Sequence, residues 1–145
     1  MQSPSGAVCC LFHEIDEATA EDAPNDVGGV AWVELNSTDI TADIAWLEAA
    51  LGITYKEMPM PDGGTYYLLE SGGESIGAGA MTTPNENVPA CWMIWFSVTS
   101  VDETLQRAAN NGGATVMPPM DMPGVGRLAA ISDSTGGVFG IIQGE

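Results

Sequence analysis

The sequence predicts an α+β protein made of two copies of a βαβββ module. The strand-like stretch at residues 30–39, VAWVELNSTD, returns in similar form at residues 93–102, MIWFSVTSVD. Trp95 follows Trp32 by 63 residues, and Asp102 follows Asp39 by the same interval. Each copy leads into a helical pattern and then into short strands separated by glycines. A repeat of this length is a supersecondary unit used twice.

Module one covers about residues 29–83 and begins with a strand at Val30. Successive side chains of a strand point to opposite faces, so this strand has two distinct sets of residues. One face carries Ala31, Val33 and Leu35, and the other carries Val30, Trp32, Glu34 and Asn36. The first face is apolar and suits a helix-covered core, whereas the second mixes an indole with polar groups.

A helix is expected over residues 40–51, because Ser37, Thr38 and Asp39 offer N-cap oxygens and Gly52 can end it with a positive φ. Its apolar residues recur at three- and four-residue spacing and need a sheet to cover them. These residues are Ile40, Ile44, Leu47 and Leu51. Strands are then expected at residues 54–58, 65–71 and 75–81.

Module two, at about residues 90–143, follows a Pro- and Asn-containing linker at residues 82–89. Its first strand, at residues 91–99, places Trp95 and Ser97 on one face and Phe96 and Val98 on the other. Ser100 and Glu103 match a capping box for a helix that runs to about residue 111. Strands are expected at residues 115–117, 127–132 and 138–143, with a loop at residues 118–126.

Composition limits the function. The chain has 145 residues, no apolar run near the ~18 residues that a membrane helix needs, and no signal peptide, so we expect a cytoplasmic protein. Its net charge of −17, with only three Lys and Arg residues, argues against binding nucleic acid or an anionic membrane. The acidity indicates either solubility, possibly in a salty habitat, or attraction of cationic small molecules.

Residues 1–28 lie outside the repeat and are rich in Asp and Glu, so we predict an acidic mobile leader. Residues 7–12 are apolar and could instead dock on the body or add an edge strand. Three cysteines form no disulfide framework. Because the single histidine, His13, is also outside the repeat, any metal site would consist mainly of carboxylates.

Four stretches resemble the vicinal oxygen chelate superfamily, which includes glyoxalase I, bleomycin-resistance proteins, fosfomycin-resistance enzymes and extradiol dioxygenases. The stretches are Trp32-Val33-Glu34-Leu35…Asp39, Trp95…Val98…Val101-Asp102, Pro123-Gly124-Val125-Gly126-Arg127, and Asp133-Ser134-Thr135-Gly136-Gly137-Val138-Phe139. The resemblance covers about residues 29–143. It implies a single domain, residues 29–145, in which the two βαβββ modules form a curled mixed sheet, an open cup with the helices outside and the ligand inside.

The same resemblance predicts where a metal would bind, since metal-using members take ligands from the first and last strands of each module. The first-strand positions fall on Trp32 and Trp95, and a last-strand glutamate position falls on Gly140. The last strand of module one offers no ligand. Indole N–H is a hydrogen-bond donor only, so these positions predict no metal ligands and no cofactor.

Several residues are candidates for binding a ligand. Trp32 and Trp95 either line a pocket or fill the core. Glu34 is a solvated carboxylate, a partner for an arginine, or a partner for a ligand cation beside the indoles. A buried Glu34 would have a raised pKa and could act as a general base. Tyr66 and Tyr67 point to opposite sides, and Tyr67 is the one we select. The remaining candidates are Asn36, Ser97 and Arg127, the last of which either neutralises Asp121 or Glu34 or binds a ligand carboxylate.

We therefore expect metal-independent binding of a small, partly aromatic or cationic organic molecule, resembling the sequestration performed by bleomycin-resistance proteins, and a homodimer. One alternative is an enzyme, either a metal-free lyase or isomerase with Glu34 as its base or a dioxygenase-type enzyme with unusual metal ligands. Another is a protein interaction module.

Overall fold

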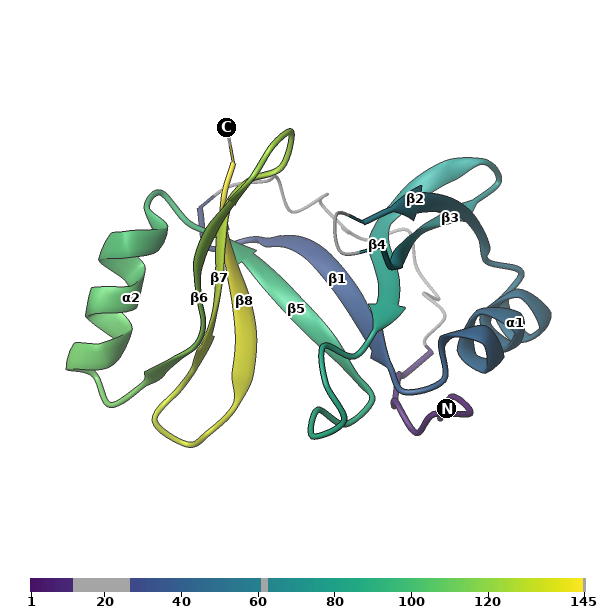
Figure 1. Cartoon of the computed structure of the whole chain (residues 1–145), viewed down its shortest axis with the longest axis horizontal. Helices are drawn as coiled ribbons and strands as arrows, with labels where there is room; N and C mark the ends of the chain where they lie inside the picture. The colour runs from purple at the N-terminus through teal and green to yellow at the C-terminus, as the bar shows by residue number, and fades with distance from the viewer. Residues whose placement is uncertain (12–26, 61–62, 145) are drawn as a thin grey trace, which may run out of the picture. The chain divides into compact units, whose positions relative to one another are not determined.

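The computed structural model describes residues 1–11, 27–60 and 63–144 (Figure 1). The described chain divides into two compact units. The first unit comprises residues 1–11 and 32–92, and the second comprises residues 27–31 and 93–144. The boundary between the two units lies within the first strand, between Ala31 and Trp32.

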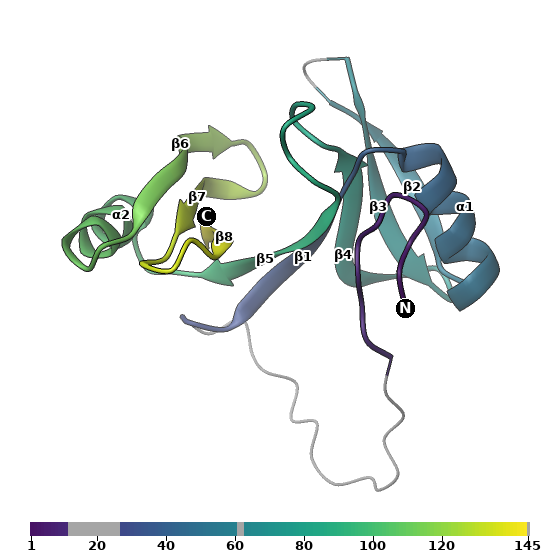
Figure 2. The same cartoon turned by 90° about the horizontal axis from the view of Figure 1, so that it is seen from below.

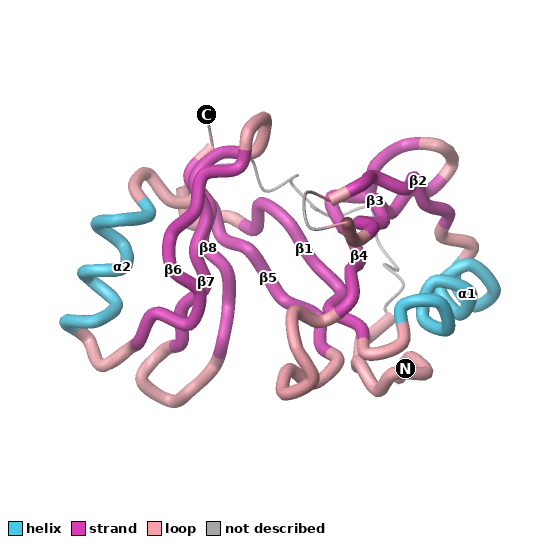
Figure 3. The backbone as a smooth tube through the Cα atoms, viewed as in Figure 1, coloured by secondary structure: helices cyan, strands magenta, loops and turns pink. Residues whose placement is uncertain are grey.

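Module one has the predicted strand, helix and three further strands. Its elements are β1 (Val30–Ser37), α1 (Ile40–Leu51), β2 (Thr54–Pro59), β3 (Thr65–Ser71) and β4 (Glu74–Thr82). The strand order is β2-β3-β4-β1, with β1 parallel to β4 and the other neighbours antiparallel. The sheet is therefore mixed, and Figure 3 shows its strands curling beside α1.

Module two repeats this plan. Its elements are β5 (Cys91–Ser97), α2 (Val101–Asn110), β6 (Ala114–Met122), β7 (Gly126–Ser132) and β8 (Val138–Gln143). The strand order is β5-β8-β7-β6, again with one parallel pair, β5 with β8. The predicted α+β fold of two βαβββ modules with a curled, mixed and unclosed sheet is confirmed.

The sheet register confirms that the two modules are copies. In module one Val33 pairs with Ala78, and in module two Phe96 pairs with Ile141. Each residue of the second pair follows its counterpart by 63 positions, the interval that separates the two tryptophans. The repeat therefore extends from the sequence motif to the hydrogen-bonded pairing of first and last strands.

The core of each module lies between its helix and one face of its sheet. In module one Leu35 is fully buried and packs with Ile44 and Leu47 of α1, as the alternation in β1 predicts. Asp39 begins α1 by accepting a hydrogen bond from the Ala42 N–H at 3.2 Å. In module two the core contains Val101, Ala129, Ile131 and Ile141, with Val98 and Leu105 packed against it.

The prediction of a loop at residues 118–126 is wrong. Strand β6 continues to Met122 through Pro118 and Pro119, and only residues 123–125 lie between β6 and β7. Proline removes a ladder donor and is tolerated where a strand is an edge or has a bulge. Strand β6 is the last in the order, and its pairing with β7 shifts between Met117 and Met120, so it meets both conditions.

Residues 1–11 dock on module one, which is the alternative that the sequence left open for residues 7–12. The buried carboxylate of Asp43 in α1 accepts hydrogen bonds from the Ser5 N–H at 3.0 Å, from the Ser5 hydroxyl, and from the Ser37 hydroxyl at 2.7 Å. Ala7 belongs to the core, and Figure 2 draws this segment in purple beside α1 and its sheet. Residues 12–26, which hold all of the leader's acidic residues and His13, lie outside the described residues.

Within the described part of the chain, neither helix is long and apolar enough to cross a membrane.

Candidate functional site

A chain of hydrogen bonds joins four side chains of module one. The Tyr66 hydroxyl accepts a hydrogen bond from Trp32 Nε1 at 2.7 Å and donates one to Glu34 Oε2 at 3.3 Å. The amide of Asn36 donates to Glu34 Oε1 at 3.4 Å. Glu34 is thus held from both sides, with an indole and a phenol next to its carboxylate.

The backbone explains how these residues meet. Trp32, Glu34 and Asn36 alternate along one face of β1, whereas Tyr66 comes from β3, two strands away. Strand β4 lies between them, and its Gly79 pairs with Glu34 on one side and with Leu68 on the other. The Tyr66 ring lies over Gly79, where an added Cβ would come within 2.1 Å of the Tyr66 hydroxyl oxygen. A glycine is therefore required for Tyr66 to reach across β4 to Glu34.

Burial controls the charge of this cluster. It raises the pKa of Glu34, and the hydrogen bonds from Tyr66 and Asn36 only partly oppose this effect. Burial and the neighbouring Glu34 charge also raise the pKa of Tyr66 strongly, so the phenol remains protonated. The same two causes raise the pKa of the Cys91 thiol, which disfavours a reactive thiolate there.

The structure places Tyr67, which the sequence analysis selected as a ligand-binding residue, away from the Glu34 cluster. Tyr67 packs against the core of module one and meets the Tyr55 ring edge-on at 5.3 Å between centroids. Tyr66, its neighbour, is the residue that joins the Glu34 cluster. The sequence could not separate the two, because Tyr66-Tyr67-Leu68-Leu69 places an aromatic and an aliphatic residue on each face. The signal in the sequence that could have identified Tyr66 is Gly79, a glycine on the strand next to the one that carries the two tyrosines.

In module two, Trp95 covers the position that the resemblance assigns to a last-strand ligand. Trp95 pairs with Gly140, and a Cβ built on Gly140 would lie 2.1 Å from Cε3 of the indole. Trp95 is only 9% exposed, and its buried Nε1 has no hydrogen-bond partner in the described structure. The Trp95 ring therefore fills the space that a side chain at position 140 would take. The Trp95 N–H has no acceptor among the described residues.

Gly140→Ala should therefore destabilise the protein by about 1–3 kcal/mol, the usual cost of overpacking a close contact. Urea unfolding followed by circular dichroism measures this loss. Gly144→Ala is the matched control, since a Cβ there meets nothing within 4 Å. Equal unfolding midpoints for the two variants would show that the indole does not lie tightly over Gly140.

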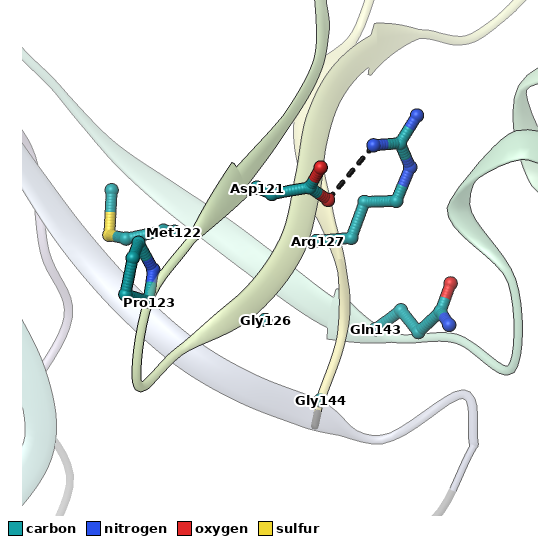
Figure 4. Close-up of a pocket in the computed structure, with 7 residues that line it drawn as sticks. All are labelled: Asp121, Met122, Pro123, Gly126, Arg127, Gln143 and Gly144. Atoms are coloured by element: carbon teal, nitrogen blue, oxygen red, sulfur yellow. Dashed lines mark hydrogen bonds and ion pairs between the residues drawn. The ribbon is translucent and has the colours of Figure 1, made fainter.

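The other two candidates of module two make contacts within their unit, Ser97 through its backbone and Arg127 through its side chain. Ser97 exchanges backbone hydrogen bonds with residues 28 and 29. Arg127 pairs with both oxygens of Asp102, at 3.0 and 3.1 Å, and with Asp121 at 2.9 Å. It lines a pocket of about 480 Å³ with Asp121 and Gln143 (Figure 4). Of the alternatives that the sequence left open, the ion pair with Asp121 is present, and the two carboxylates of Asp102 and Asp121 make Arg127 a weak anion site.

The residues at the family's metal positions do not fit a metal ion. Trp32 directs its N–H at Tyr66, and Trp95 covers Gly140, so neither position offers a lone pair. Over residues 1–11, 27–60 and 63–144, no group of three or more His, Cys, Asp or Glu side chains is placed to hold a metal. Glu34 lies two residues after Trp32 on β1, and the groups that contact its carboxylate are hydrogen-bond donors rather than further carboxylates.

Paired βαβββ modules with a polar and aromatic face on the first strand define a glyoxalase-like protein. The family model described as the Glyoxalase/Bleomycin resistance protein/Dioxygenase superfamily matches residues 29–140. The chain belongs to this superfamily, as the sequence motifs indicated.

Two curated relatives illustrate the range of the family. The chain is 32% identical over 140 residues to "Putative glyoxylase CFP32" of Mycobacterium tuberculosis, covering 97% of this chain and 53% of that protein. It is 29% identical over 127 residues to the anthracycline biosynthesis protein DauV of Streptomyces sp., covering 79% and 46%. The chain thus spans about half the length of the curated relatives that it matches.

Solved structures share the fold at low identity. Hypothetical protein BH1468 of Bacillus halodurans superposes with a TM-score of 0.60 at 15% identity, covering 83% of this chain and 96% of that one. Methylmalonyl-CoA epimerase of M. tuberculosis superposes with a TM-score of 0.57 at 18% identity, covering 81% and 88%. At such identities the likeness concerns the fold alone.

Proposed function

We propose that the face of module one built from Trp32, Glu34 and Tyr66 binds a small organic cation with an aromatic part, without a metal. The observation that carries this proposal is the partly desolvated carboxylate of Glu34 held beside an indole and a phenol. A cation placed there would neutralise Glu34 and face aromatic rings, whose attraction contributes about 0.5–2 kcal/mol. The net charge of −17 favours the approach of cations over anions.

Titration with benzyltrimethylammonium and with neutral benzyl alcohol tests this proposal. The cation should bind at least about tenfold more tightly than the alcohol, because the alcohol lacks both the charge attraction and the cation–π attraction. Binding is measured by isothermal titration calorimetry at physiological salt. At this ionic strength exposed charges more than about 8 Å apart are largely screened, which limits nonspecific attraction of the cation to the acidic surface.

Each titration is run with and without EDTA. The affinity for the cation should be the same in both. Equal affinities for the two probes, or binding that appears only after a divalent metal is added, would contradict the proposal.

A second candidate function is proton-abstracting catalysis with Glu34 as the base. The raised pKa of Glu34 favours it, since a base whose pKa approaches the working pH transfers protons efficiently. A putative glyoxylase and an epimerase are among the similar proteins, which gives it fold-level support only. Turnover that survives chelation and disappears in Glu34→Gln would favour this enzyme over a binding protein.

A further inference from the structure

A second pocket lies in module two, under the C-terminal half of α2. Its volume is about 460 Å³, within the range of small-molecule sites. The wall on the sheet side is apolar and includes Phe96, Val98, Ile131, Phe139 and Ile141. The helix side is formed by Thr104, Arg107, Ala108 and Asn111, so a polar rim borders an apolar floor.

Comparison with module one explains why a pocket exists here. The three residues of α2 that contact the core are Val101, Leu105 and Ala108, and three of the core residues of α1 have the same spacing: Ile40, Ile44 and Leu47. The third position is therefore Leu47 in one module and Ala108 in the other. Leu47 is only 1% exposed and closes the space under α1. Ala108 is three carbons smaller and leaves the corresponding space under α2 open.

The residue before this position also differs. In module one it is Trp46, which packs against the core, whereas in module two it is Arg107, which is exposed at the rim of the pocket. Arg107 donates from Nη2 to the Thr104 hydroxyl at 2.9 Å. Among the described residues it makes no ion pair, in contrast to Arg127, whose charge is matched by two aspartates. A guanidinium with no carboxylate partner in the described part of the chain thus borders an apolar pocket.

We propose that this pocket binds a small monocarboxylate with an aromatic or branched apolar body. The body would contact Phe96 and Phe139, whose rings already meet edge-on at 5.5 Å between centroids. The carboxylate would pair with Arg107, whose planar fork of N–H donors matches carboxylate geometry. This pocket would bind an anion, whereas the Glu34 face would bind a cation. The pocket also lies between α2 and its sheet, so it is a separate site.

The test compares 2-naphthylacetate with its neutral amide by isothermal titration calorimetry on the full chain. The acid should bind about fivefold more tightly than the amide, the size expected of one ion pair at an exposed rim. Arg107→Gln should remove this preference, because it weakens binding of the acid more than binding of the amide. Lys56→Gln removes an exposed cation from module one and serves as the control for net charge, with both affinities unchanged.

Ala108→Leu tests the pocket itself, because it restores the residue type that closes the space in module one. It should abolish binding of the acid and the amide while the protein remains folded by circular dichroism. Undiminished binding in Ala108→Leu, equal affinity of the wild type for acid and amide, or no saturable binding of the acid would overturn the proposal. If Ala108→Leu does not fold, the Arg107→Gln comparison decides.

Discussion

Glu34→Gln is expected to weaken binding of benzyltrimethylammonium by about 10- to 100-fold. This is the loss of affinity expected when one interaction with a partly desolvated charge is removed. Glutamine has nearly the same shape but only one acceptor oxygen, so it keeps one of the hydrogen bonds from Tyr66 and Asn36 while the other partner reorients, and the protein should remain folded. What is lost is the negative charge that faces the ligand. Calorimetric titration of the variant measures the effect.

Glu70→Gln is the matched control, because it removes one carboxylate from the same module, on strand β3, and changes the net charge equally. It should leave the affinity for the cation unchanged. If both variants lose affinity to the same extent, binding depends on overall charge and not on the Glu34 cluster.

The affinity should also depend on pH. Since burial raises the pKa of Glu34, the carboxylate becomes protonated, and the cation is released, as the pH falls through a value above the ordinary ~4.3 of glutamate. Glu34→Gln should bind weakly at every pH. A wild-type affinity that is constant down to the ordinary glutamate range would show that Glu34 is not desolvated.

Asp43→Ala is expected to lower the free energy of unfolding by about 3 kcal/mol. The carboxylate is fully buried and accepts hydrogen bonds from Ser5 and Ser37, so its removal leaves buried donors without a partner. Urea unfolding provides the measurement. Glu48→Ala, an exposed carboxylate on the same helix, should change the stability little. If Asp43→Ala and Glu48→Ala are equally stable, residues 1–11 are not held by Asp43.

The effect of Asp43 should decrease in acid. Burial by itself would raise its pKa, but the hydrogen bonds from Ser5 and Ser37 together outweigh burial and leave the pKa lowered. A lowered folded pKa gives stability that is present above the unfolded value, near 4, and is lost as the pH falls through the folded pKa. The difference between wild type and Asp43→Ala should therefore be constant near neutrality and shrink below about pH 4.

Much of the fold could be predicted because local signals agreed with one another. Caps, an apolar stripe and Gly52 define α1 at Ile40–Leu51, and alternation assigns the two faces of β1. The prediction failed at β6, where two prolines resemble a loop. An edge strand with bulges accommodates them, and whether a strand is an edge is not a local property of its sequence.

The candidate site was predictable only in part. Trp32, Glu34 and Asn36 share a face of one strand, so alternation was sufficient to group them. Tyr66 joins them from across β4. Predicting this contact would need the strand order β3-β4-β1 and the effect of the glycine at position 79. The partners of Arg127 depend on the pairing of β6 with β7, where Asp121 lies opposite Arg127, and on the contact with Asp102, so the sequence left alternatives.

The most direct test of the central claim is the titration of the Glu34 carboxyl carbon by NMR, with and without benzyltrimethylammonium. The proposed binding site predicts a pKa above the ordinary glutamate range in the free protein, and a lower pKa when the cation is bound, because the cation favours the charged form. Tyr66→Phe, which removes a hydrogen bond to the carboxylate, should raise the pKa of the free protein further. A Glu34 carboxyl that titrates in the ordinary range and does not respond to the cation would contradict the account.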